Sequence, residues 1–186
     1  MRVIAGRYKG RRLKAPTWEG LRPTSDKLRE TLFNILAPRI EGARVLDGYA
    51  GTGAVGIEAL SRGARHVTFV ERDRRATALI AENVKACDPA AVYTIETGDV
   101  ATLLRTRPAA FDLIWLDPPY DSNSVEALDA AAGALAPGGL VVLERATRRA
   151  PDHPDSLTRI RDVKSGDSTI TFFRSHEHQS HEDHGG

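Results

Sequence analysis

The sequence predicts an α/β fold built around a mostly parallel β-sheet. Three observations lead to this prediction. Apolar runs alternate with amphipathic helices, a glycine-rich loop joins one such run to a helix, and two alternating strands close the pattern. Near-continuous apolar runs are typical of strands that helices cover on both faces. The chain has 186 residues, of which 41% are hydrophobic, and this is enough for one domain with a substantial core.

The first half of the chain predicts a helix followed by two strand–helix units. Thr24 is expected to cap the first helix, Asp26 lies in its first turn, and Pro38 is expected to end it. The elements that follow are a strand at Val45–Leu46, a helix at Ala54–Arg62 stopped by Gly63, a strand at Val67–Val70 and a helix at Asp73–Ala86.

The second half continues this alternation and then changes. Its expected elements are a strand at Val92–Ile95, a helix at Val100–Leu104, a strand at Phe111–Leu116, a helix at Val125–Leu135 and a strand at Leu140–Leu143. Two alternating segments follow, Leu157–Val163 and Ser168–Phe173, and Lys164–Asp167 joins them as a hairpin turn. We therefore expect seven strands, with an antiparallel pair at the end of the sheet.

Composition excludes several classes of protein. No apolar run approaches the roughly 20 residues that a membrane span requires, and the N-terminus lacks the apolar region of a signal peptide. Cys87 is the only cysteine, which excludes an internal disulfide and a four-cysteine metal site. These features predict a cytoplasmic protein without a resident metal, and a monomer is the simplest expectation.

The first 22 residues carry seven basic side chains and a single acid, although the net charge of the whole chain is only +1. Such a cluster suits contacts with nucleic-acid phosphates; the alternative is a solvated charged edge. The surrounding Val3–Ile4 and Leu13 suggest a short extended or hairpin segment. The candidate RNA-binding residues are Arg2, Arg7, Lys9, Arg11, Arg12 and Lys14.

Three regions are expected along the chain. Residues 1–23 form a basic N-terminal extension, residues 24–174 form the main domain, and residues 175–186 form a polar tail without periodicity, which is expected to be disordered. The tail holds four of the six histidines, so it is either a solvated tail or an adventitious metal site. These histidines are His176, His178, His181 and His184.

The loop after the first strand carries the pattern G-x-G-x-x-G at Gly51, Gly53 and Gly56. Glu71 follows Gly51 by 20 residues, at the end of the next strand. Glycines in a strand–loop–helix unit let a ligand approach the backbone, and the acid can bind ribose hydroxyls, so we expect a nucleotide-type cofactor.

Asp47 separates two cofactor classes. A dinucleotide places its pyrophosphate at the helix N-terminus, where a carboxylate is unfavourable. S-adenosylmethionine (SAM) has no phosphate and carries a sulfonium and an ammonium group, so Asp47 favours SAM over NAD. Asp99 follows the third strand, where it either accepts a hydrogen bond from the adenine amine or caps the next helix.

The stretch Asp117-Pro118-Pro119-Tyr120 directly follows the apolar strand Phe111–Leu116. Both prolines fix φ, and each restricts the residue before it, so this turn is stiff. Asp117 and the Pro118 carbonyl provide hydrogen-bond acceptors beside the flat ring of Tyr120. This arrangement suits a nucleobase with an amino group; the alternative is a proline-rich turn with a satisfied aspartate.

At this point the chain resembles a known family. Val45–Gly56, Glu71, Asp99 and Asp117–Tyr120 occur in the order of SAM-dependent methyltransferases that modify exocyclic amines. The stretches Arg2–Gly6, Gly10–Leu13 and Leu21–Asn34 are similar to the RsmD family of bacterial 16S rRNA (guanine-N2)-methyltransferases. The resemblance runs from about Arg2 to Phe173. It departs at Gly48-Tyr49, where the family usually has a bulkier aliphatic residue and Phe, and in a short loop at Pro151–Ser156.

The resemblance implies a Rossmann-like SAM-dependent methyltransferase that modifies guanine N2 in 16S rRNA within the 30S subunit. It implies that Asp117, Pro118 and Tyr120 are catalytic, with Tyr120 stacking on the base. The candidate cofactor-binding residues are Asp47, Tyr49, Gly51, Gly53, Glu71, Arg72, Asp99 and Val100, together with Arg22 and Thr24, which the family's matching stretch suggests.

Other functions stay open. A DNA adenine-N6 methyltransferase has a similar loop but needs a target-recognition region for which this chain has no room. A glutamine-N5 methyltransferase typically has Asn where Asp117 stands. A non-catalytic RNA-binding assembly module would not need Asp47, Glu71 and Asp117 intact, and an NAD oxidoreductase is disfavoured by Asp47.

Overall fold

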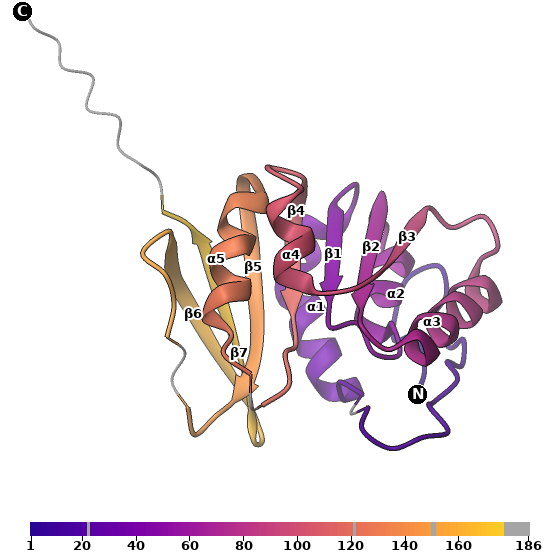
Figure 1. Cartoon of the computed structure of the whole chain (residues 1–186). Coiled ribbons are helices and arrows are strands. Elements are labelled where there is room, and N and C mark those ends of the chain that lie inside the picture. Colours follow the sequence, from indigo (N-terminus) through magenta and orange to yellow (C-terminus); the bar gives the residue numbers. More distant parts are fainter. Residues whose placement is uncertain (22, 121, 150–151, 177–186) are drawn as a thin grey trace, which may run out of the picture.

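The computed structural model describes residues 1–21, 23–120, 122–149 and 152–176, and these form one seven-stranded sheet with helices on both faces (Figure 1). The predictions for Arg22 and for His178, His181 and His184 fall outside this range. In chain order the elements are α1 (Asp26–Ile40), β1 (Arg44–Gly48), α2 (Ala54–Ser61), β2 (His66–Glu71), α3 (Arg74–Cys87), β3 (Tyr93–Thr97), α4 (Val100–Arg105), β4 (Phe111–Leu116), α5 (Val125–Ala134), β5 (Leu135–Ala146), β6 (Leu157–Ser165) and β7 (Ser168–Ser175).

The strand order is β3-β2-β1-β4-β5-β7-β6. Strands β1 to β5 pair in parallel, and β7 pairs antiparallel with both β5 and β6. The predicted sheet with its antiparallel end is therefore confirmed. The hairpin turn is shorter than expected, because Lys164 still pairs with Thr169 and Ser165 with Ser168. Gly166, in the turn itself, adopts φ 61°, a conformation that favours glycine.

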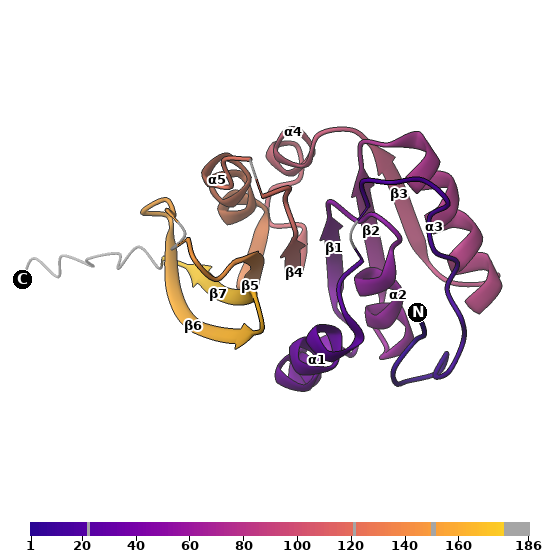
Figure 2. The same ribbon diagram turned by 90° about the horizontal axis from the view of Figure 1, so that it is seen from below.

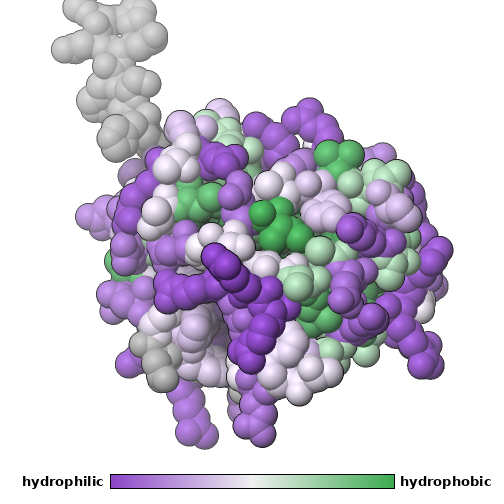
Figure 3. All heavy atoms as spheres, turned by 45° about the vertical axis from the view of Figure 1, so that its right-hand side comes forward, coloured by the Kyte–Doolittle hydropathy of each residue, from purple (hydrophilic) through white to green (hydrophobic). Residues whose placement is uncertain are grey.

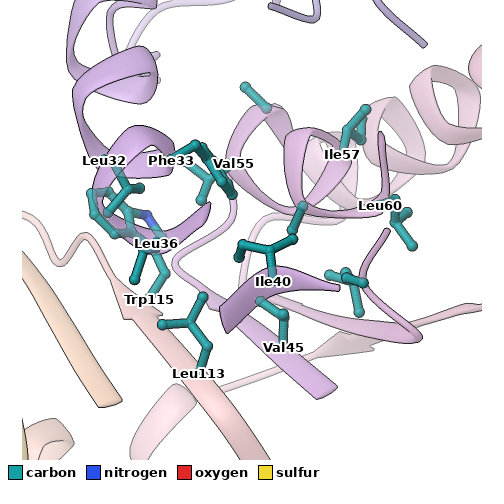
Figure 4. Close-up of a cluster of buried hydrophobic side chains, with 14 of the residues drawn as sticks. Leu32, Phe33, Leu36, Ile40, Val45, Val55, Ile57, Leu60, Leu113 and Trp115 are labelled. Atoms are coloured by element: carbon teal, nitrogen blue, oxygen red, sulfur yellow. The ribbon is translucent and has the colours of Figure 1, made fainter. Parts of the chain in front are cut away.

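Two layers of helices cover the sheet, so its central strands are buried on both faces. Helices α1, α2 and α3 share one hydrophobic cluster with the sheet, and α4 and α5 share another. Figure 2 shows α4 and α5 on one face and α1 and α2 on the other. Figure 4 shows Leu36 and Ile40 of α1 beside Val45, Leu113 and Trp115 of the sheet.

Most element boundaries differ from the prediction by a few residues, and three differences at helix ends have a clear physical reason. Ser25, not Thr24, caps α1, since its hydroxyl accepts from the Leu28 N–H at 3.1 Å. Helix α1 continues through Pro38 to Ile40, because near a helix end proline removes only one backbone hydrogen bond. Strand β5 already begins at Leu135, where Phe111 of β4 pairs with it, so α5 ends one residue earlier than expected.

The N-terminal residues form the hairpin-like turn that the sequence suggested. Val3 N–H donates to the Arg11 carbonyl at 3.0 Å, and Gly10 N–H donates to the Val3 carbonyl at 2.9 Å. Val3, Tyr8 and Leu13 are buried in the cluster that contains α1 to α3. The extension is thus packed against the main body of the protein rather than projecting from it.

The face of the molecule that Figure 3 shows is largely polar. On the face shown in Figure 3, hydrophilic side chains predominate and hydrophobic ones form small separate spots. No helix in the described part of the chain is long and apolar enough to cross a membrane.

Candidate functional site

A cavity of about 1050 Å³ opens at the carboxyl edge of the parallel strands. It lies at the end of β1, whose two neighbours in the sheet are β2 and β4. After β1 the chain first builds β2 and β3 on one side of this strand and then crosses to β4 on its other side. In open α/β sheets, ligands bind at such switch points outside the carboxyl ends of the strands. Position alone therefore makes this cavity the candidate site.

Most residues selected from the sequence line this cavity. Among the described candidates for cofactor binding and catalysis, Gly53 alone is not part of the lining. The lining candidates are Thr24, Asp47, Tyr49, Gly51, Glu71, Arg72, Asp99, Val100, Asp117, Pro118 and Tyr120. The fold thus brings the glycine loop and the Asp117–Tyr120 turn together, although more than 60 residues separate them in the sequence.

Two glycines of the loop are required by backbone geometry rather than by a ligand. Gly53 precedes α2 with φ 79°, in the left-handed region. A Cβ atom on Gly56 would lie 2.3 Å from the ring of Phe69 in β2. The loop therefore takes its tight path because α2 packs directly against β2.

Asp47 is the most buried acid of the cavity lining, with 1% of its surface exposed. Its Oδ2 accepts a hydrogen bond from the Gly56 N–H, in the first turn of α2, at 2.9 Å. Burial raises the pKa of Asp47 to about 8, the bond from Gly56 opposes this shift, and the charge of Glu71 adds to it. The N-terminus of α2 already has a hydrogen-bond acceptor in Asp47, which disfavours a pyrophosphate there. A cationic ligand would favour the ionised form of Asp47.

Glu71 fixes the glycine loop from the end of β2. Its carboxylate accepts from Gly51 N–H at 2.8 Å, and from the N–H groups of Arg72 at 2.8 Å and Asp73 at 3.0 Å. A carboxylate so firmly held presents its remaining lone pairs to the cavity in a fixed direction.

Asp99 caps α4, which confirms one of its two predicted roles. Its Oδ2 accepts from both the N–H and the hydroxyl of Thr102 at 2.9 Å, and Arg72 pairs with Oδ1 at 3.2 Å. These bonds from Thr102, with the charge of Arg72, hold the pKa of Asp99 below its usual value. Asp99 also lines the cavity, so a contact with adenine stays a prediction.

Asp117 lies beside a second acid that the sequence did not reveal. Glu144 of β5 is 9% exposed, lines the same cavity and forms a side-chain hydrogen bond with Asp117. Burial, the charges of Glu144 and Asp47, and this hydrogen bond raise the pKa of Asp117 well above its usual range. Asp117 therefore binds its proton more tightly than an exposed aspartate does.

The rest of the Asp117–Tyr120 turn lies at the cavity rim. The N–H and the hydroxyl of Ser122 both donate to the Pro119 carbonyl, at 3.0 and 2.8 Å, which closes the turn. Tyr120 lines the cavity yet has 50% of its surface exposed. An aromatic ring in this position can be reached from solvent by a large substrate.

The N-terminal hairpin is anchored by Glu58, a fully buried acid of α2. Its two oxygens accept from the N–H groups of Ile4 and Ala5 at 2.9 and 3.0 Å. It also forms ion pairs with Arg62 at 2.9 Å and with the fully buried Arg29 at 3.6 Å. Glu58 is thus a structural residue; its signal in the sequence was a lone acid within an otherwise apolar helix.

The predicted RNA-binding side chains are all exposed, but the tip of the hairpin lies away from the cavity. Arg7 N–H donates to the Ser61 carbonyl, and the Arg11 guanidinium donates to the Ala86 carbonyl, at the C-terminal ends of α2 and α3. The 14 residues of α3 span about 20 Å and the eight of α2 about 12 Å, and these lengths separate the Arg11 and Arg7 contacts from the cavity edge. The chain then returns past Trp18, which stacks with Arg75, to Gly20 and Leu21 in the cavity lining.

Comparison with known proteins identifies the family. The model of the family described as "Conserved hypothetical protein 95" matches residues 1–174. Ribosomal RNA small subunit methyltransferase D of Haemophilus influenzae is 35% identical over 173 residues, which cover 89% of each chain. The protein of that name from Escherichia coli is 39% identical over 126 residues, or 68% of this chain and 63% of that one. The chain belongs to this family, the RsmD family.

Solved structures agree with membership of the RsmD family. The match to the structure of yhhF from Escherichia coli has 32% identity and a TM-score of 0.83, and it covers 94% of this chain and 97% of that one. Trm1 of Pyrococcus horikoshii in complex with S-adenosyl-L-methionine shares the fold, with a TM-score of 0.65 at 16% identity. The predicted Rossmann-like SAM-dependent methyltransferase fold is thereby confirmed.

For this member of the RsmD family, sequence reasoning missed one end of the cavity. Glu144 follows the predicted strand Leu140–Leu143 by one residue, and its place at a strand's carboxyl end was the available signal. Ser165, Asp167 and Ser168 also line the cavity, because the β6–β7 turn reaches back over this edge. Thr147 N–H holds the turn there by donating to the Asp167 carbonyl at 2.8 Å.

Proposed function

We propose that this protein transfers a methyl group from SAM to the N2 amine of a guanine in 16S rRNA, within the 30S subunit. The observation that carries the proposal is the Asp117–Tyr120 turn, which lies beside the glycine loop in one cavity at the switch point. The names of its relatives in the RsmD family support an rRNA substrate.

The charge of the cavity suits SAM. Its described lining includes eight acidic side chains, and the sole cationic one there, Arg72, pairs with Asp99. SAM, when bound, supplies a methyl group on a positively charged sulfur. Asp47 would face the cationic methionine part of SAM, Glu71 its ribose and Asp99 its adenine. The remaining walls of the cofactor site would be formed by Thr24, Tyr49 and Val100, with Arg22 near them.

Asp117 and the Pro118 carbonyl are the groups that would act on the guanine amine. The lone pair of N2 is delocalised into the ring, so the amine is a weak nucleophile. Two acceptors for its two N–H groups would orient the lone pair and favour a more tetrahedral nitrogen. Positive charge develops on this nitrogen during transfer, and the Asp117 carboxyl would stabilise it in a site with little water.

Tyr120 would hold the base. Recognition of RNA relies on stacking of unpaired bases against aromatic rings, and enzymes that modify a base take it out of its stack. The half-exposed ring at the cavity rim is suited to this role. The basic hairpin, at the C-terminal ends of α2 and α3, would meanwhile bind phosphates of the same RNA.

The first test separates methyl transfer from cofactor binding. Asp117→Ala is expected to abolish transfer from tritiated SAM to 30S subunits isolated from a strain that lacks the gene. Calorimetry should show that SAM still binds. The matched control is Asp112→Ala, at the other end of β4, where the acid pairs with Arg44 and does not line the cavity. Full activity of the Asp117 variant would refute the mechanism.

The second test identifies the substrate. Mass spectrometry of 16S rRNA from the deletion strain should show that a single N2-methylguanosine is missing. Loss of a different modification would overturn the proposed substrate, while leaving methyl transfer itself intact.

A further inference from the structure

Strand β6 is an edge of the sheet, and a β-bulge sends two of its arginines to opposite faces. Arg159 and Arg161 pair with two consecutive residues of β7, Phe173 and Phe172, so Ile160 is an extra residue on β6. Without this residue the two arginines would share a face, because side chains alternate along a strand. Bulges often re-aim a side chain at a sheet edge or beside a functional site, so the direction of Arg161 calls for an explanation.

Arg161 projects on the face of the sheet that α1 covers. Its partner Phe172 belongs to the hydrophobic cluster of α1, α2 and α3, and paired residues of antiparallel strands project on the same face. Arg174 pairs with Leu140, a member of the same cluster, and therefore projects on this face as well. Both arginines are exposed. We call Arg161 and Arg174 the β6–β7 arginine pair.

The two faces of these strands differ in charge. On the face that α5 covers, Arg159 and Arg145 share the carboxylate of Asp162. On the α1 face, neither arginine of the β6–β7 pair forms an ion pair with any residue that the structure describes. The bulge thus separates one arginine from the acid that its neighbour uses and places it next to a second cation. Such a pair suits an anion from outside the protein.

The β6–β7 arginine pair lies in line with the cavity. Arg161, Val163 and Ser165 follow one another along β6 on the α1 face, and Ser165 lines the cavity. The four residues from Arg161 to Ser165 span about 13 Å of strand. A polymer that places one of its units in the cavity can therefore reach the pair with the next few.

We propose that the β6–β7 arginine pair binds phosphates of the RNA substrate, on the side of the cavity opposite the N-terminal hairpin. The inference rests on the proposed function for the identity of the RNA, and deepens it by adding a second binding surface. Arginine is suited to this role, because its planar guanidinium can donate two parallel hydrogen bonds to one phosphate.

The charge of the cavity explains why phosphates would be held outside it. Eight acidic side chains line the cavity in the described part of the chain, and its one cation there, Arg72, pairs with Asp99. These acids repel the phosphates of a substrate whose base enters the cavity. Cations placed on the surface beyond the rim offset this repulsion without weakening the binding of a cationic cofactor.

The hairpin and the β6–β7 arginine pair lie on opposite sides of the cavity. The hairpin contacts the C-terminal ends of α2 and α3, whereas β6 forms the far edge of the sheet. Figures 1 and 2 both show β6 and α3 at opposite ends of the molecule. Six intervals between seven strands correspond to about 29 Å. Two anchors this far apart on one RNA would reinforce each other and hold it while the base between them leaves its stack.

The experiment replaces both arginines and measures RNA binding directly. The probe is a fluorescently labelled RNA stem-loop, titrated with the full chain in KCl between about 50 and 200 mM. Arg161→Gln combined with Arg174→Gln should weaken binding roughly 10-fold at about 100 mM and lower the slope of log affinity against log salt by about 1.5, because two phosphate contacts are lost. With 30S subunits and tritiated SAM, KM for the subunit should rise by a similar factor, whereas kcat stays within about twofold.

The matched control makes the same change in charge on the same strand, but on its other face. Arg159 and Lys164 pair with Phe173 and Thr169, which project on the α5 face. Arg159→Gln combined with Lys164→Gln should therefore leave the salt slope within about 0.3 of the wild-type value. Calorimetry should show that SAM binds all of these proteins equally, which excludes a loss of fold.

Each outcome decides the question. An equal loss of slope in both double variants would show that only net charge matters, and would overturn the inference. Unchanged binding of the RNA stem-loop together with weaker binding of 30S subunits would also overturn it, in favour of an acidic protein as the partner. A wild-type protein that transfers no methyl group to 30S subunits, while the Arg161 and Arg174 variant still loses the slope, would refute the proposed function and support the RNA-binding surface.

Discussion

Two regions of this protein bury acidic side chains, and they do so in opposite ways. Glu58, in α2, is surrounded by Arg29, Arg62 and two backbone N–H groups. Asp47, Asp117 and Glu144, at the carboxyl edge of the sheet, lie close to one another, and burial raises the pKa of the first two. A buried acid with cations around it stabilises the fold, whereas buried acids that line a cavity are suited to a ligand with cationic or hydrogen-donating groups.

The largest expected effect lies at Glu58. Glu58→Ala should destabilise the protein by about 3–5 kcal/mol, because it removes one of the two carboxylates that pair with the fully buried Arg29, and it leaves the N–H groups of Ile4 and Ala5 without their acceptor. Urea unfolding followed by circular dichroism measures this loss. Glu82→Ala, which breaks an exposed ion pair with Lys14, is the control and should cost less than about 1 kcal/mol. Equal costs for the two variants would show that burial does not make the Glu58 ion pairs more important than the exposed one.

Removing the charge of Asp47 should stabilise the protein, in contrast to the loss of Glu58. Its pKa is higher in the folded protein, about 8, than in the unfolded chain, so the folded state binds this proton more tightly. The stability that this group contributes is complete below about pH 4 and is lost as the pH rises towards 8. Asp47→Asn should flatten this decline and stabilise the ligand-free protein at pH 8 by roughly 1–3 kcal/mol, while weakening SAM binding.

The control for Asp47 is Asp112, which pairs with Arg44. The hydrogen bond from Arg44 lowers the pKa of Asp112, so its contribution to stability is present at neutral pH and is lost as the pH falls through its folded pKa. Asp112→Asn should therefore reduce stability at pH 7 and change it little in acid. Thermal melts between pH 4 and 8 that give both variants the same trend would exclude this interpretation.

Gly56 connects the two regions, since it lies two residues before Glu58 and donates its N–H to Asp47. Gly56→Ala places a methyl group against Phe69 and should force α2 away from β2, at a cost of about 1–3 kcal/mol. Gly133→Ala, in α5, is the control, because its Cβ would meet no atom within 4 Å. We expect the Gly56 variant alone to lose both stability in urea and affinity for SAM.

The smallest effect on stability is expected from the basic hairpin. Replacing Arg7, Arg11 and Arg12 together with Ala should change the free energy of unfolding by no more than about 0.5 kcal/mol. It should, however, raise the concentration of 30S subunits needed for activity and lower the slope of log affinity against log salt by about 2. Replacing Arg105 and Arg107, on the α4 side, should leave that slope unchanged; an equal change in both would show that the hairpin has no special role.

The sequence predicted this architecture well because buried parallel strands leave a strong pattern. Phe111–Leu116 is apolar throughout, and Asp117 follows directly, so both the strand and the acid at its end could be recognised. Asp47 could be interpreted for the same reason. Glu144 could not, because its importance depends on β5 lying beside β4, and the order of strands in a sheet is not written in any single segment.

Local chemistry explains the other differences. Thr24 and Ser25 are both good helix caps, so the sequence does not show which of them precedes the first residue of α1. In the structure Ser25 does, and its hydroxyl accepts from the Leu28 N–H. Pro38 looked like a helix end, but the packing of Ile40 against the sheet outweighs the one hydrogen bond that proline removes. For Pro38, a tertiary contact therefore outweighs the local signal.

The anchoring of the N-terminal hairpin has a consequence for the order of events during synthesis. Ile4 and Ala5 bind Glu58, 54 and 53 residues further on, and Tyr8 donates to Asp88, 80 residues away. Contacts between such distant residues form only after the later segment has been made, and closing long loops is slow. The first segment to leave the ribosome is therefore among the last to be fixed. Until then a nascent chain carries its six basic side chains between Arg2 and Lys14 unfolded, close to the RNA of the particle that is making it.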